Sequence, residues 1–183
     1  DTLPVVVNER SGDLRERWLE LGSSWLQNRT EWDALPAADG PDSWQRIDVA
    51  VDMAVREGEP GSDSRKVDVV KPVQQIVPSK VDPAVVSNVE IGEDTVSFSV
   101  DKVGVPVLIR VSYFPNWQAT GAEGPYRVAP NMMEVVPTSE NVSLNFKASF
   151  VDRFAYLLTI AGLVAVVVMW RRDRRPEVIK TDL

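Results

Sequence analysis

The sequence contains no cysteine and no histidine among its 183 residues. Without cysteine the chain has no disulfide, no thiolate nucleophile and no cysteine metal site. Without histidine it lacks the side chain that most often serves as a general base or metal ligand near neutral pH. Neither a Ser-His-Asp nor a Cys-His arrangement can therefore be assembled, and we expect no cofactor and no metal site.

Basic residues are in the minority: 20 Lys and Arg stand against 27 Asp and Glu, a net charge of −7. No basic stripe that could neutralise phosphates is present before the C-terminal region, which excludes nucleic acid as a partner. Acidic neighbours such as Glu93 and Asp94 are plentiful. Glycoside hydrolysis needs two carboxyls held about 5–9 Å apart in a cleft, and no such pair stands out. The sequence names no catalytic residue, so whether the chain belongs to an enzyme stays open.

Long hydrophobic runs are absent except for one, FAYLLTIAGLVAVVVMW, from Phe154 to Trp170. This run holds no charge and no proline, and as a helix it would reach about 25 Å, close to the thickness of a bilayer core. Tyr156 and Trp170 lie where aromatic belts form, and arginines follow at once. The run predicts one transmembrane helix. The alternative is a buried helix of a soluble domain.

Charge on the two sides of this run predicts its orientation. Before it stand 15 Lys and Arg against 24 Asp and Glu, and after it five against three. The positive-inside rule places the basic tail in the cytoplasm and residues 1–153 on the exoplasmic side of the cell membrane. We divide the chain into an N-terminal strand and amphipathic helix (1–35), an exoplasmic β-sandwich (36–150), a transmembrane helix (151–171) and a cytoplasmic tail (172–183).

The predicted membrane helix carries a small-residue face. Ala161 and Ala165 are four residues apart, a spacing that lets another helix pack closely. We expect the lipid bilayer as one partner and other transmembrane helices, of the same parent protein or complex, as another. The alternative is a helix that faces lipid all round and happens to contain alanine.

Near the N-terminus, Leu14, Trp18, Leu21 and Trp25 follow one another at helical spacing. This stripe predicts a short amphipathic helix. Two tryptophans on so short a helix need a large partner surface. We expect that surface to belong to a neighbouring domain; the alternative is that the tryptophans stack on a ligand.

The rest of the chain is patterned for strands. Apolar residues that are often β-branched recur at 4–7, 47–55, 67–77, 85–91, 96–100, 105–114, 127–128, 132–136 and 142–146. Short strands about ten residues apart indicate an antiparallel sandwich. We expect 105–114 to be a central strand buried on both faces, and the turn-rich residues 33–44 to be a connector. The predicted fold class is mainly β: an antiparallel β-sandwich with a short N-terminal amphipathic helix and one C-terminal transmembrane helix.

One stretch is unusually dense in aromatic, glycine and proline residues: GVPVLIRVSYFPNWQATGAEGPYRVAPNMMEVVP, from Gly104 to Pro137. It resembles the C-terminal exoplasmic β-sandwich of large bacterial multi-pass membrane proteins of the YfhO-like, GT-C glycosyltransferase-like type, and most of all their actinobacterial members. The shared features are a strand ending in Tyr-Phe-Pro-x-Trp, a small-residue turn, a Val-Pro step and a strand that feeds the last membrane helix. The resemblance covers about residues 36–165.

The resemblance implies a domain that packs over a membrane domain. The family's presumed catalytic acids lie in an N-terminal membrane domain that this sequence does not contain, so no catalytic residue carries over. The motif residues at issue are Tyr113, Phe114, Pro115, Asn116, Trp117, Tyr126 and Arg127, with Gly121 and Gly124 in turns.

Two roles are open for this motif. In one, its aromatic rings cover the end of the sandwich core and its glycines serve turns with positive φ. In the other, Tyr113, Trp117 and Tyr126 form a platform on which a glycan stacks, while Asn116, Glu123 and Arg127 bond hydroxyls.

Two functions follow as hypotheses. The chain is either a non-catalytic exoplasmic domain and anchor of a GT-C-like membrane glycosyltransferase, orienting a glycan acceptor, or a single-span cell-surface protein that binds a partner protein or cell-wall glycan.

Overall fold

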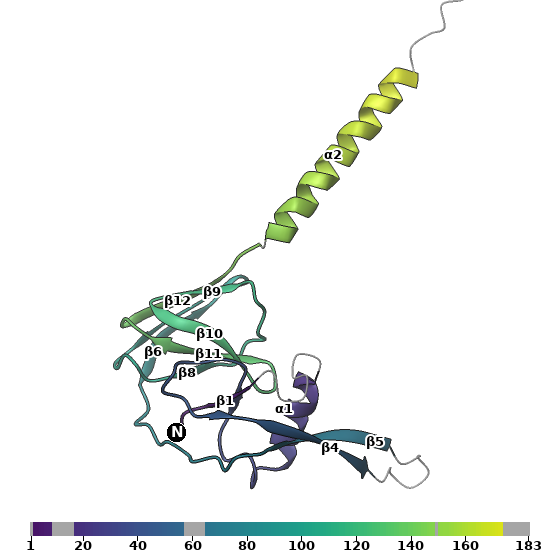
Figure 1. Cartoon of the computed structure of the whole chain (residues 1–183). Coiled ribbons are helices and arrows are strands. Elements are labelled where there is room, and N and C mark those ends of the chain that lie inside the picture. The colour runs from purple at the N-terminus through teal and green to yellow at the C-terminus, as the bar shows by residue number, and fades with distance from the viewer. Residues whose placement is uncertain (1, 9–16, 57–64, 149, 174–183) are drawn as a thin grey trace, which may run out of the picture. The chain divides into compact units, whose positions relative to one another are not determined.

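The computed structural model describes residues 2–8, 17–56, 65–148 and 150–173. They form two compact units, a β unit from Asp1 to Phe146 and a helical unit from Lys147 to Leu183. Figure 1 shows the strands of the first unit and the long helix α2 of the second. The predicted fold class, mainly β with a helix near the N-terminus and an apolar helix at the C-terminus, is confirmed.

The described residues of the β unit form three sheets, and Figure 1 labels most of their strands. The largest has the order β3 (Arg46–Ile47), β1 (Val5–Val7), β2 (Pro36–Ala37), β10 (Ala122–Val128), β11 (Met132–Pro137), β8 (Val107–Ile109). The second has the order β6 (Val86–Ile91), β7 (Thr95–Val100), β12 (Asn141–Phe146), β9 (Trp117–Thr120). The third is the hairpin of β4 (Val49–Arg56) and β5 (Arg65–Pro72).

The two larger sheets enclose one hydrophobic core of the β unit. Val96, Phe98 and Val100 alternate along β7 and are buried, as period-two patterning predicts. They pack in one cluster with Met133 and Val135 of β11 in the opposite sheet. Because polar residues occupy the alternate positions, one face of the second sheet is apolar and the other is solvated.

Helix α1 (Trp18–Gln27) confirms the predicted tryptophan stripe: Trp18, Leu21 and Trp25 are buried. The predicted Leu14 lies outside the described residues. The expectation that the tryptophans pack on a neighbouring domain is wrong, because they join a core with β1 and with Val70 of β5 inside the same unit. Val70 also donates its backbone N–H to Ser24 Oγ at 2.9 Å, so α1 is fixed to the hairpin by a buried hydrogen bond as well.

Two further expectations are wrong. Residues 105–114 do not form a central strand: β8 spans only Val107–Ile109 and lies at an edge, with Leu108 38% exposed. Pro106, which has no N–H for a ladder, immediately precedes it. The connector at 33–44 includes β2, which pairs in parallel with β1. Parallel pairing brings together segments far apart in sequence, so no local pattern signals it.

Helix α2 runs from Phe150 to Asp173. Its segment Phe154–Arg172 has a mean hydropathy of 1.9 over 19 residues, and none of it is buried. Thr159, the polar residue in the run, donates its hydroxyl to the Ala155 carbonyl at 2.9 Å, so the helix satisfies it internally. Ala161 and Ala165 are exposed. This helix is long and apolar enough to span a membrane.

Candidate functional site

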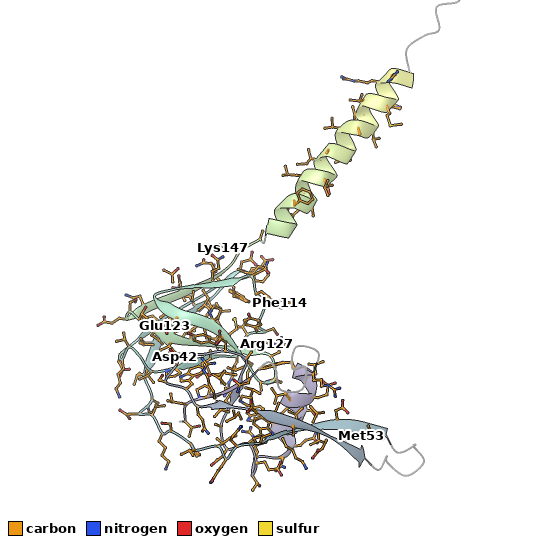
Figure 2. The ribbon with its side chains drawn as sticks, viewed as in Figure 1. Asp42, Met53, Phe114, Glu123, Arg127 and Lys147 are labelled. Atoms are coloured by element: carbon orange, nitrogen blue, oxygen red, sulfur yellow. The ribbon has the colours of Figure 1, made fainter. Side chains whose placement is uncertain are left out.

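Tyr113 to Asn116 of the aromatic motif lie between β8 and β9, where Figure 2 labels Phe114, whereas Tyr126 and Arg127 lie in β10. The Trp117 N–H donates to the Phe114 carbonyl at 3.2 Å, which closes the turn. Trp117 begins β9 and lies opposite Phe146, the last residue of β12. Their rings meet edge to face, with centroids 5.4 Å apart and planes at 80°. The indole is only 8% exposed, so its faces serve the core.

The accessible part of the motif is its tip. Phe114 is 54% exposed, and one side of its ring meets Phe146 edge to face at 6.3 Å. Pro115 is exposed and Asn116 is half-buried. Phe146 therefore lies against two rings at the point where the chain leaves the β unit.

Arg127 of β10 links the motif to α1. Its guanidinium carbon lies 4.8 Å from the centroid of the Trp18 ring and 6.0 Å from that of Tyr113. Its Nε–H donates to Asn131 Oδ1 at 2.8 Å, and Tyr113 donates its backbone N–H to the Asn131 carbonyl at 2.9 Å. Partial burial lowers the pKa of Arg127. The Arg127 guanidinium thus connects α1 to the loop between β8 and β9 through its contacts with Trp18 and Tyr113.

Tyr126 lies in a different cluster from Trp117 and Tyr113. Its ring meets Trp44 edge to face at 5.4 Å. Burial, and then the negative charge of Glu123, raise the pKa of the Tyr126 phenol. The three rings of the hypothetical platform are therefore divided between two clusters. Glycan binding at the motif stays a prediction, with Phe114 as its accessible ring.

The two glycines of the motif both have positive φ, +79° at Gly121 and +100° at Gly124. At Gly121 the carbonyl accepts the N–H groups of Thr138 and Ser139 at 2.8 and 3.0 Å, and an added Cβ would lie 2.3 Å from the Asn141 carbonyl oxygen. Gly124 lies within β10, at an irregularity in its pairing with β11. Gly121 thus serves a turn, whereas Gly124 serves a bulge.

Sequence patterning missed one unusual buried residue, Glu134. It lies in β11 between Tyr126 on one neighbouring strand and Leu108 on the other. Glu134 is 5% exposed, and within the part of the chain that the structure describes its Oε2 has no hydrogen-bond partner. Burial raises its pKa from the ordinary value of 4.5 to about 7. The sequence feature that indicates this residue is a single acid within the otherwise apolar run MMEVV, residues 132–136.

Comparisons of the chain with known protein families, with curated proteins and with solved structures find no match. Among the described residues, no group of three or more acidic side chains is placed to hold a metal ion. The site that the structure presents is thus a set of packed aromatic contacts around Arg127 and Phe146.

Proposed function

We propose that the chain is a membrane-anchored exoplasmic β domain whose role is non-catalytic. The observation that carries this is the apolar segment Phe154–Arg172 of α2, none of which is buried. Exposing so many leucine, valine and isoleucine side chains to water costs roughly 25 cal/mol for each Å² of apolar surface. A bilayer removes that cost, and the backbone of a helix needs no hydrogen bonds from lipid.

The exoplasmic side is supported by the arginines that follow the span. Arg171 and Arg172 end the helix, and Arg174 and Arg175 come next in the sequence. Such a cluster is retained on the cytoplasmic side. A non-catalytic role is supported by the lack of histidine and cysteine and by the structural use of Arg127 and Trp117 in core contacts.

For the parent protein we propose a GT-C-like membrane glycosyltransferase, in which this domain packs on the membrane domain and orients a glycan acceptor. Support comes from the resemblance of the sequence of residues 104–137 to that family and from the contacts of Trp117 and Phe114 with Phe146. These contacts pack aromatic rings around the last residue of β12, the strand that precedes α2 in the chain. The alternative is a single-span surface protein that binds a partner protein or cell-wall glycan.

The native absence of cysteine makes sidedness directly testable. One cysteine is introduced at exposed Glu140, before β12, and in a second variant at Thr181 in the tail. We expect a membrane-impermeant maleimide to label Glu140→Cys in intact cells, and to label Thr181→Cys only after permeabilisation. The opposite pattern would reverse the orientation. Labelling of both sites in intact cells, with the membranes shown to be sealed, would exclude a cytoplasmic tail.

The two parent proteins differ in size and in upstream sequence. An antibody against the β unit should detect a large multi-span protein in native membranes if the glycosyltransferase proposal holds. A band near the 20.3 kDa of this chain would favour the single-span alternative.

A further inference from the structure

A cleft of about 740 Å³ opens between the end of α1, the segment after it, the edge strand β8 and the start of β11. Leu26, Leu108 and Met132 contribute apolar surface, and Trp25 forms part of its wall. Leu26 is 53% exposed and Leu108 38% exposed, so this surface is accessible. Small-ligand sites have this size and this mixture of apolar lining with a few polar groups.

Two arginines, Arg29 and Arg110, line the same cleft. The Arg29 guanidinium lies over the Trp25 ring, 4.1 Å from its centroid. Trp25 is 8% exposed and fixed in the core, so it holds the guanidinium in place. Stacking uses the face of the guanidinium and leaves its in-plane N–H donors free to bind an oxyanion.

Neither arginine forms an ion pair with a described residue. Within the described ranges, no carboxylate oxygen lies within 4.0 Å of Arg29 or Arg110, whereas Arg17, Arg46, Lys71 and Lys102 all have such partners. Acids outnumber bases in this chain, 27 against 20. Two arginines without an acidic partner in one cleft therefore give it a local positive charge that an external anion would complement.

Asp33 also lines the cleft and limits the charge of the ligand. Its carboxylate repels a second negative charge, so a monoanion fits better than a dianion. We propose that this cleft binds an organic monoanion, a carboxylate or phosphodiester carried on an apolar body, with Arg29 and Arg110 holding the oxyanion and Leu26, Leu108 and Met132 contacting the apolar part. The proposal is independent of the membrane assignment.

The test uses the full chain in phosphatidylcholine nanodiscs, with empty nanodiscs as the blank. Hexanoate, its neutral analogue hexanamide, and dibutyl phosphate are titrated by calorimetry. 5-Fluorotryptophan NMR, assigned with Trp25→Phe, reports whether the ring at the cleft responds. We expect hexanoate or dibutyl phosphate to bind at least about tenfold more tightly than hexanamide, the size of one charge-assisted hydrogen bond, and to shift the Trp25 signal.

Arg29→Gln and Arg110→Gln should each weaken binding of the anion about tenfold or more while leaving hexanamide unchanged. Lys102→Gln removes one positive charge elsewhere and is the matched control; near-ultraviolet circular dichroism verifies that each variant is folded. Equal binding of hexanoate and hexanamide, equal loss in Lys102→Gln, or no shift at Trp25 would each overturn the proposal. A response only to dibutyl phosphate would assign a phosphodiester, and one only to hexanoate a carboxylate.

Discussion

Glu134 gives the sharpest test of how the β unit is built. Glu134 is 5% exposed and lies between Tyr126 and Leu108 of the neighbouring strands, and burial raises the pKa of its carboxyl from 4.5 to about 7. Glu134→Gln keeps the size and polarity of the side chain and removes its titration. The effect of the change on the free energy of unfolding should therefore depend on pH.

The sign follows from the direction of the shift. Below about pH 4.5 the carboxyl is protonated in both the folded and the unfolded chain, so its burial does not lower the free energy of unfolding. As pH rises towards 7, the unfolded chain ionises while the folded chain keeps its proton, so the wild type loses stability. A shift from 4.5 to about 7 corresponds to a loss of about 3 kcal/mol that is complete above pH 7. Glutamine does not ionise, so the Glu134→Gln variant should not show this loss of stability.

Urea unfolding of the full chain in a nonionic detergent, followed by tryptophan fluorescence, measures the effect, since five of the six tryptophans precede α2. The free energy of unfolding of Glu134→Gln relative to wild type should rise by about 3 kcal/mol between about pH 4 and about pH 8. The exposed Glu140→Gln is the control and should show no such rise. An equal difference between variant and wild type at both pH values would refute a raised pKa at Glu134.

Five other substitutions, arranged in three comparisons, test the structural account by the same assay. Trp117→Ala should cost about 3–5 kcal/mol because it removes a buried indole, whereas Phe114→Ala, at a ring 54% exposed, should cost less than about 1 kcal/mol; equal losses would contradict the burial difference. Gly121→Ala should cost more than about 3 kcal/mol, since strain and a clash add, and Gly104→Ala, with nearly the same φ and open space, about 1 kcal/mol; similar costs would show that the clash relaxes. Arg127→Lys keeps the charge but loses the planar contact with two rings, and should lower the free energy of unfolding by about 1–2 kcal/mol. An unchanged free energy of unfolding would contradict a stabilising role for the Arg127 guanidinium.

Patterns that act over a few residues could be predicted from the sequence. The helical spacing of Trp18, Leu21 and Trp25 and the alternation along β7 each depend on which side of one element faces the core. The apolar run of α2 is equally local. The fold class and most elements follow from these signals. An element that buries one face has apolar residues that recur at the period of a helix or of a strand.

What could not be predicted depends on contacts between distant segments. The parallel pairing of β1 with β2 and the edge position of β8 are set by the neighbours that fold beside them. One interpretation of the motif predicts that Arg127 binds glycan hydroxyls, but its guanidinium contacts the rings of Trp18 and Tyr113. Trp18 lies more than 100 residues before Arg127 in the sequence, and Tyr113 lies 14 residues before it. The cleft containing Arg29 and Arg110 likewise joins a helix end to a strand edge that no sequence window contains.

The central claim is that Phe154–Arg172 lies in lipid. Alkaline carbonate extraction of membranes from cells that express the full chain, followed by flotation on a density gradient, tests it most directly. Carbonate strips peripheral proteins but leaves a spanning helix in place, so we expect the chain to float with the lipid after extraction. Release of the folded chain into the soluble fraction would contradict the claim, and with it the anchored exoplasmic domain.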